Sequence, residues 1–186
     1  MDNGASSYRR FLDGDDDAIA EIVGDYKDGL ILYLNSYVRN LFTAEELTED
    51  TFFRLITKKP KYSGKSTFKS WLYAIGRHVA VDFIRHHSKT LGTPIEDLEN
   101  ILCEEQSLEQ AYIKEERKIT VHRALSALST DYRAILWLVY FEGFSNKEAS
   151  VILKKNDRQI KNLLYRAKQS LKSKLEKEGF FDEDLR

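Results

Sequence analysis

The side chains best suited to chemistry lie near the C-terminus, where basic and amide residues recur along one predicted helix. Residues 154–177 include nine basic and two acidic residues, an excess of seven positive charges in a chain of net charge −1. Such an excess along one helix suits neutralisation of DNA phosphates. Arg, Gln and Asn also make bidentate contacts to guanine and adenine. The candidates lie off the apolar stripe: Arg158, Gln159, Lys161, Asn162 and Tyr165.

The preceding residues predict the other part of a helix-turn-helix. Apolar residues at helical spacing predict a helix over 131–142, which ends at Gly143. Ser145 followed three residues later by Glu148 predicts a capping box at the start of a short helix over 146–153.

A polar turn at 154–156 separates this short helix from the longer basic one, which we expect Asp157 to cap. A recognition helix presents its N-terminal part to base edges in the major groove. The alternative is an amphipathic helix with ordinary solvated lysines. In either case the buried face comprises Ile160, Leu164, Ala167 and Leu171.

An acidic helix is predicted to begin near Thr43, with Glu46 three residues on as a capping-box partner. We expect its inner face to comprise Leu47, Thr51, Phe52 and Leu55, and its outer face Glu45, Glu46, Glu49 and Asp50. Metal sites in helical bundles use Glu-x-x-His pairs that point inward. No such pair occurs here, so we expect a solvated acidic face, no metal and no cofactor.

The next loop, 58–66, is basic and contains Tyr62. Its end, Gly64-Lys65-Ser66, resembles the tail of a phosphate-binding loop, but that motif needs glycine where Lys59 stands. Lysines around an aromatic ring suit single-stranded nucleic acid instead, because bases stack on aromatics while lysines follow the backbone.

Thr67 is predicted to cap a long helix with the core stripe Phe68, Leu72, Ile75, Val79 and Phe83. Trp71 fits either the core or an exposed stacking position. His78, Asp82 and His86 share a face, but two helical turns separate the end residues by roughly 12 Å. That distance is too long for one metal ion, so we interpret them as a polar, partly basic face.

The length of the chain allows one or two small domains, and its few prolines and many helix formers favour an all-α fold. Of its 186 residues 42% are hydrophobic, only 2 are proline, and no apolar run is long enough to span a membrane. Shorter helices are expected over 18–25 and 29–41. The polar N-terminus predicts no signal peptide, and the single cysteine, Cys103, excludes an internal disulfide, which suits a reducing cytoplasm.

The predicted boundaries are a first domain over 1–88, a linker over 89–107, a second domain over 108–178 and a tail over 179–186. Residues 95–117 contain eight acidic and two basic residues, which is typical of an acidic linker leading into a helix.

Two motifs in order resemble the extracytoplasmic-function (ECF) group of the sigma-70 family. AEELTEDTFFRL at 44–55 and FKSWLYAIGRHVAVDFIRH at 68–86 are similar to region 2 of that family. LSALSTDYRAILWLVYFEGFSNKEASVIL and KNLLYRAKQSLKSKL are similar to its region 4. The resemblance covers roughly residues 8–175.

This resemblance implies a promoter-specificity subunit of bacterial RNA polymerase without catalytic residues of its own. The minus-35 duplex would be read by Arg158, Gln159, Lys161, Asn162, Tyr165 and Arg166. The melted minus-10 strand would be held by Lys61, Lys65, Trp71, Arg77, His78 and Arg85. The polymerase clamp helices would dock on Glu45, Glu46, Glu49, Asp50 and Arg54.

The implied partners are core RNA polymerase, through its clamp helices and flap, promoter DNA and an anti-sigma factor, with no membrane insertion. A helix-turn-helix repressor or activator acting without polymerase is the main alternative. It explains residues 131–177 but leaves the motifs of 44–86 without a role. An enzyme is the third possibility, and the sequence has no nucleophile–base motif, phosphate loop or metal cluster to support it.

Overall fold

The computed structural model describes residues 3–91, 121 and 123–177, and every regular element in those ranges is helical. The prediction of an all-α protein is confirmed. Most of the predicted linker, the start of the predicted second domain, Cys103 and the tail lie outside the described residues.

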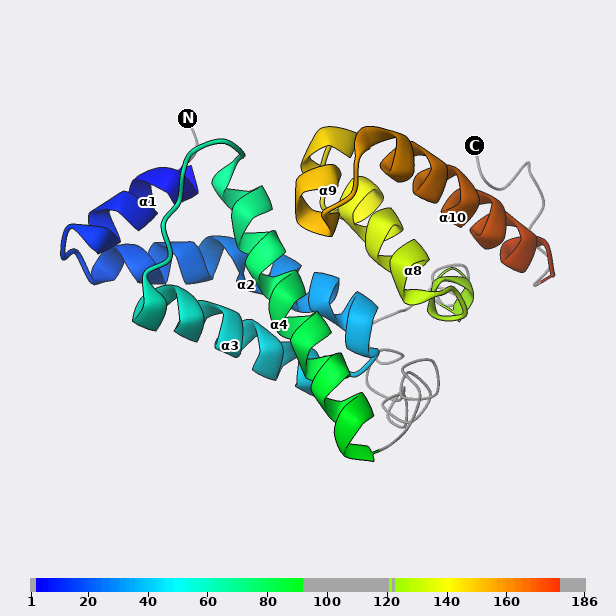
Figure 1. Cartoon of the computed structure of the whole chain (residues 1–186), viewed down its shortest axis with the longest axis horizontal. Coiled ribbons are helices and arrows are strands. Elements are labelled where there is room, and N and C mark those ends of the chain that lie inside the picture. The colour runs from blue at the N-terminus through cyan, green and yellow to red at the C-terminus, as the bar shows by residue number, and fades with distance from the viewer. Residues whose placement is uncertain (1–2, 92–120, 122, 178–186) are drawn as a thin grey trace.

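The N-terminal bundle consists of α1 (Asn3–Leu12), α2 (Asp17–Val38), α3 (Leu41–Lys58) and α4 (Phe68–Leu91). Figure 1 shows α2 as the central helix, which packs against the other three. Apolar and aromatic side chains that recur at helical spacing meet in one core, where the large, almost fully buried residues include Tyr8, Ile22, Leu30, Leu34, Leu55, Phe68 and Leu72.

The two short helices predicted over 18–25 and 29–41 are in fact one helix, α2. No proline interrupts it, and glycine inside a helix costs only about 1 kcal/mol relative to alanine. A Cβ atom at Gly29 would lie 2.5 Å from the Tyr73 hydroxyl oxygen, so the glycine permits a close approach. The helix ends at Val38, followed by Arg39 in the left-handed conformation (φ 55°).

The N-cap of α3 is Asn40 and not Thr43, so that prediction was wrong. The Asn40 side-chain oxygen accepts a hydrogen bond from the Thr43 backbone N–H at 2.9 Å, which satisfies a free donor of the first turn. The helix therefore starts two residues before the predicted cap. The predicted inner face is confirmed, since all four of its residues are buried: Leu47, Thr51, Phe52 and Leu55.

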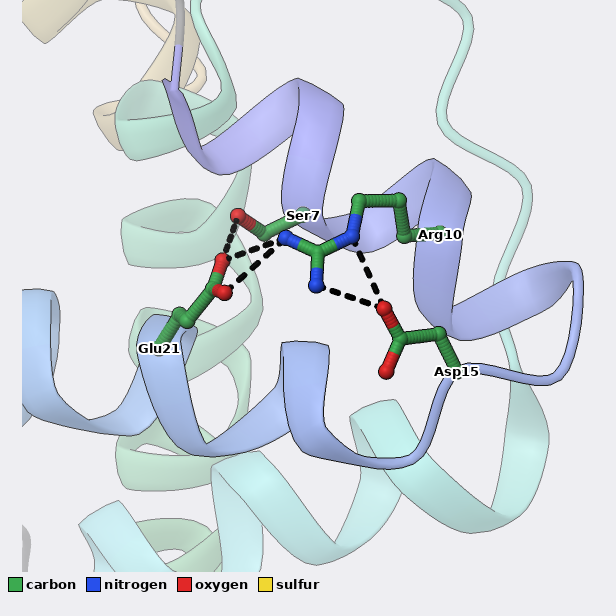
Figure 2. A network of polar contacts seen from close by, with 4 residues as sticks. All are labelled: Ser7, Arg10, Asp15 and Glu21. Carbon is green, nitrogen blue, oxygen red and sulfur yellow. Dashed lines mark hydrogen bonds and ion pairs between the residues drawn. The ribbon is translucent and has the colours of Figure 1, made fainter.

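A surface network ties α1 to α2 around the turn between them (Figure 2). The Arg10 guanidinium contacts the Asp15 carboxylate at 2.5 Å and the Glu21 carboxylate at 2.9 Å. The Ser7 hydroxyl also donates a hydrogen bond to Glu21 at 2.7 Å. These hydrogen bonds lower the pKa of both carboxyl groups, so the network is complete at neutral pH.

The C-terminal group consists of α8 (Thr130–Leu136), one π-helical turn η1 (Trp137–Phe141), α9 (Asn146–Leu153) and α10 (Asp157–Lys177). The helix predicted over 131–142 is thus present, but its last turn is wider than an α-helix. Gly143 ends it with a φ of 71°, as predicted.

The two groups of helices are in contact. The bundle helix α4 packs against α9, and α2 packs against α8 and η1. In Figure 1, α10 lies on the side of α8 and α9 that faces away from the bundle. The arrangement exposes the outer face of α10 and covers part of α4.

Candidate nucleic-acid interface

A helix-turn-helix formed by α9 and α10 positions the basic C-terminal side chains. The predicted capping box is confirmed, because Ser145 and Glu148 exchange hydrogen bonds at the start of α9. The turn begins at Lys154 in the left-handed conformation (φ 52°). Ile160 and Ala167 are fully buried and therefore set the rotation of α10 about its axis.

All six side chains predicted to read duplex DNA are exposed on α10: Arg158, Gln159, Lys161, Asn162, Tyr165 and Arg166. Tyr165 is 66% exposed although its ring is large and apolar. The Lys161 ammonium pairs with the Asp157 carboxylate at 2.9 Å, and this contact raises the pKa of the lysine. A lysine side chain is an ammonium donor at neutral pH, so Lys161 suits contact with DNA phosphates or base edges.

The cap of α10 is Asn156 and not Asp157, which corrects the sequence-based prediction by one residue. The Asn156 side-chain oxygen accepts from the Gln159 backbone N–H, and the Gln159 side-chain oxygen accepts from the Asn156 backbone N–H, both at 2.8 Å. This is a second capping box, with an amide in place of the hydroxyl. Gln159 therefore serves the helix as well as the exposed face.

The loop before α4 is held by an aromatic cluster. The Trp71 ring lies 5.1 Å from that of Tyr62, 5.3 Å from that of Tyr8 and 5.4 Å from that of Phe68. The Tyr62 hydroxyl donates to the Ser66 carbonyl at 2.5 Å. Trp71 is half-buried and packs against the core, so it belongs to this aromatic cluster and remains partly accessible.

The charged candidates around α4 occupy different environments. Lys61 and Lys65 are exposed on the loop, and Arg85 is exposed and lies 3.6 Å from Asp82. Arg77 and His78 are half-buried, and each has a buried ring or guanidinium nitrogen without a hydrogen-bond partner. The predicted cap of α4 is confirmed, because the Thr67 hydroxyl accepts from the Ser70 backbone N–H at 3.3 Å.

The pKa of His78 is affected by charged residues of both groups of helices. Burial lowers its pKa, and the positive charges of Lys154 and Arg77 lower it further. Arg54 acts in the same direction, and only Asp82 opposes it. His78 is therefore neutral at pH 7 in this arrangement.

The predicted acidic face of α3 is present, with Glu45, Glu46, Glu49, Asp50 and Arg54 all exposed. Arg54 lies 3.9 Å from Asp82 of α4. Sequence reasoning missed the apolar part of this face: Phe42 is 68% exposed and Phe53 is 64% exposed. Phe42, Glu46, Glu49 and Phe53 follow one another at spacings of three and four, which was a readable signal.

Comparison with known proteins identifies the family. The profile of Sigma-70 region 2 matches residues 22–90, and that of Sigma-70, region 4 matches residues 118–171. The chain is 31% identical over 155 residues to the ECF RNA polymerase sigma factor SigM of Bacillus subtilis, covering 83% of this chain and 93% of that protein. The chain belongs to the ECF sigma factors.

Further similarities agree with this assignment. The sigma factor is 25% identical over 167 residues to SigX of Bacillus subtilis, covering 87% of this chain and 86% of SigX. Its fold resembles RpoE of Bartonella quintana, solved with the anti-sigma factor NepR (TM-score 0.67, 23% identity, 84% of this chain and 96% of that one). It also resembles CnrH, solved with the cytosolic domain of CnrY (TM-score 0.63, 18% identity, 94% and 95%).

As a member of this family, the sigma factor binds core RNA polymerase and directs promoter-specific initiation of transcription. The structure does not merge the three predicted residue sets into one site. The duplex-reading set lies on α10, the strand-capturing set on the loop and α4, and the docking set on α3.

Two further findings concern metal binding and membrane-spanning helices. Among residues 3–91, 121 and 123–177, no group of three or more His, Cys, Asp or Glu residues is placed to hold a metal ion. None of the described helices is long and apolar enough to cross a membrane.

Proposed function

We propose that this sigma factor reads the minus-35 duplex with the exposed face of α10. The observation that carries the proposal is that all six predicted reading side chains are exposed on this helix while Ile160 and Ala167 are fully buried. Arg158 and Asn162 would contact base edges, and Lys161 and Arg166 would contact bases or phosphates. The preference for particular bases follows from these side chains.

The melted minus-10 strand is captured by the loop at 58–67 and by α4. Lys61 and Lys65 supply exposed positive charge beside Tyr62, whose ring contacts that of Trp71. Unstacking a base costs a few kcal/mol, which stacking and phosphate contacts must offset. The remaining members of the set are Arg77, His78 and Arg85.

Docking to polymerase uses the acidic face of α3 for the clamp helices and the second domain for the flap. The alternation of carboxylates with Phe42 and Phe53 suits a partner surface that is basic and partly apolar. On the second domain, Tyr140 and Phe141 are 54% and 51% exposed and are candidates for the flap contact.

The remaining parts of the proposal concern regulation and location. RpoE of Bartonella quintana was solved with the anti-sigma factor NepR, which supports an anti-sigma factor for this chain too. The protein acts in the cytoplasm, supplies no reaction of its own, and has domains at 1–88 and 108–178 with a linker at 89–107 and a tail at 179–186.

Transcription in vitro tests the proposal. The full chain would be added to sigma-free bacterial core polymerase on a genomic promoter library, and transcript starts sequenced. We expect discrete starts that share two upstream elements, and Lys161→Ala or Asn162→Ala should cost about 1–3 kcal/mol of minus-35 recognition. No starts, together with tight duplex binding by the free chain, would instead indicate a repressor or activator.

A further inference from the structure

The contact between the two helical groups is centred on one carboxylate. The Glu142 side chain, only 11% exposed, accepts a hydrogen bond from the Tyr73 hydroxyl at 2.7 Å and pairs with the Lys69 ammonium at 2.9 Å. Lys69 also donates to the Glu142 backbone carbonyl at 3.1 Å. A residue that follows η1 is thus bound by two donors that both belong to α4.

The bundle, not the second domain, builds the site that receives this carboxylate. Lys69 and Tyr73 are four residues apart and share one face of α4. Gly29 of α2 completes the site, because a Cβ atom there would lie 3.0 Å from both Glu142 carboxylate oxygens and 2.5 Å from the Tyr73 oxygen. Tyr73 is 1% exposed, and burial raises its pKa, so its hydroxyl remains a donor.

A second acidic residue of the C-terminal group contacts the start of α4. Glu148 accepts a hydrogen bond from the Thr67 hydroxyl, which also caps α4, at 3.2 Å. Burial alone would raise the pKa of Glu148, but hydrogen bonds from Ser145 and Thr67 lower it, so it is ionised. Two carboxylates therefore lie against the first turns of the helix that is expected to hold DNA.

We propose that Lys69, Tyr73 and the notch at Gly29 form an anion site for a backbone phosphate of the captured DNA strand, which Glu142 occupies in the free chain. The inference rests on the proposed function. A carboxylate and a phosphate both offer oxygens that accept from an ammonium and a hydroxyl. Lys69, Tyr73 and Arg77 are spaced i, i+4, i+8 along α4. The anion site therefore lies between Arg77, a member of the strand-capturing set, and the basic loop.

The consequence is that closure and strand capture exclude each other. The packing of α9 on α4 (Figure 1) and the filling of the anion site by Glu142 occur together, so the strand can enter only after the second domain leaves. The apparent affinity of the free chain for a single strand then equals the affinity of the open form multiplied by the fraction of molecules that are open.

A simpler explanation is that Glu142 only ties the two domains together. The two explanations differ at Lys69 and Gly29. If Glu142 is only a tie, any variant that breaks the contact exposes the same DNA-binding surface and gains affinity. If the anion site is real, variants that damage the site itself open the chain without that gain.

The test uses the full chain, its radius of gyration by small-angle X-ray scattering, and its affinity for a short fluorescent oligothymidylate at low salt. Glu142→Gln keeps the size of the side chain and should give a larger radius and about tenfold tighter binding. Lys69→Met and Gly29→Ala should also increase the radius, but without tighter binding. Thermal unfolding checks that each variant is folded.

Two matched controls complete the design. Gly24→Ala lies on the same helix in open space, so it should change neither the radius nor the affinity. Lys27→Met, at an exposed lysine of α2, tests the loss of one positive charge in the Glu142→Gln background. We expect Lys69→Met in that background to cancel the gain and Lys27→Met to preserve most of it.

Equal gains for Glu142→Gln, Lys69→Met and Gly29→Ala would overturn the anion site, and an unchanged radius in Glu142→Gln would overturn the closure. Both results leave the proposed function standing if the wild-type chain directs initiation with core polymerase. Failure of the wild-type chain in that assay would instead refute the proposed function.

Discussion

Gln159 must satisfy two demands at once. Its amide oxygen accepts a hydrogen bond from the Asn156 backbone N–H, and the residue lies on the exposed face of α10. Bidentate contact with adenine needs both the oxygen and the amide NH₂ of a glutamine. The capping box therefore leaves Gln159 to act through its NH₂ donors, for example toward a phosphate.

Replacement of Gln159 by Glu separates these two demands. Gln159 occupies position N3 of the capping box, where Glu is also common. Thermal unfolding should therefore show unchanged or slightly higher stability. The added negative charge should reduce transcription from promoters that depend on the minus-35 element. Gln159→Ala serves as the comparison and should lower stability by about 0.5–1 kcal/mol. Unreduced transcription by Gln159→Glu would show that this residue does not face DNA.

His78 predicts a pH dependence of stability. Burial and the charges of Lys154, Arg77 and Arg54 depress its pKa below 6.5 in the folded chain, with Asp82 opposing. The unfolded chain then binds the proton more readily, so stability present above pH 6.5 is lost as pH falls toward the folded pKa. Chemical denaturation across this range should show the loss, and His78→Gln should diminish it. His86→Gln is the control, and an equal effect there would contradict the prediction.

At the scale of elements, one aromatic cluster joins α1, the basic loop and α4. Tyr8 donates its hydroxyl to the Pro60 carbonyl at 2.8 Å, and its ring contacts that of Trp71. The Tyr62 ring contacts the rings of Trp71 and Phe68 in the same cluster. The conformation of the loop at 58–67 therefore depends on a helix that lies before the region 2 match in the sequence.

Trp71→Ala should affect both stability and strand capture. Loss of a half-buried indole with three ring contacts should cost about 2–3 kcal/mol, less than a fully buried tryptophan. Abortive transcription on a duplex template should fall, whereas a template with a pre-melted minus-10 bubble should lose less. Trp71→Phe keeps most ring contacts and provides the control. Unchanged stability in Trp71→Ala would show that the cluster is not a packing unit.

For the molecule as a whole, Arg133 complements Glu142 at the contact between the two groups. It is buried, at 6% exposure, and its Nε donates to the Ser36 carbonyl of α2 at 2.9 Å across 97 residues of sequence. Its other nitrogens donate to the Leu128 carbonyl and to the Thr130 hydroxyl within the second domain. One side chain thus organises the start of α8 and holds it on α2.

Arg133→Met should destabilise the chain by about 2–4 kcal/mol, because several buried carbonyl groups lose their donor. Denaturation should also lose cooperativity between the two groups, and scattering should show a larger radius of gyration. Arg123→Met, at an exposed arginine of the same domain, is the control. A radius equal to that of the wild type would mean that Arg133 acts only within the second domain.

The sequence by itself determined the features that depend on neighbours three or four residues apart. The α9 capping box, the Gly143 helix end, the buried stripe of α3 and the exposed face of α10 were all predicted, because periodicity and capping are local. The two motifs in order also sufficed for the family.

Only the tertiary structure decided which competing local signals prevailed and which distant residues meet. Asn40 and Asn156 cap their helices in place of Thr43 and Asp157, although all four side chains can cap. Gly29 lies inside the continuous helix α2, where the Tyr73 hydroxyl and the Glu142 carboxylate approach its backbone closely. Contacts such as Tyr73–Glu142, which are 69 residues apart, arise from burial of two faces against each other, and no local pattern encodes that pairing.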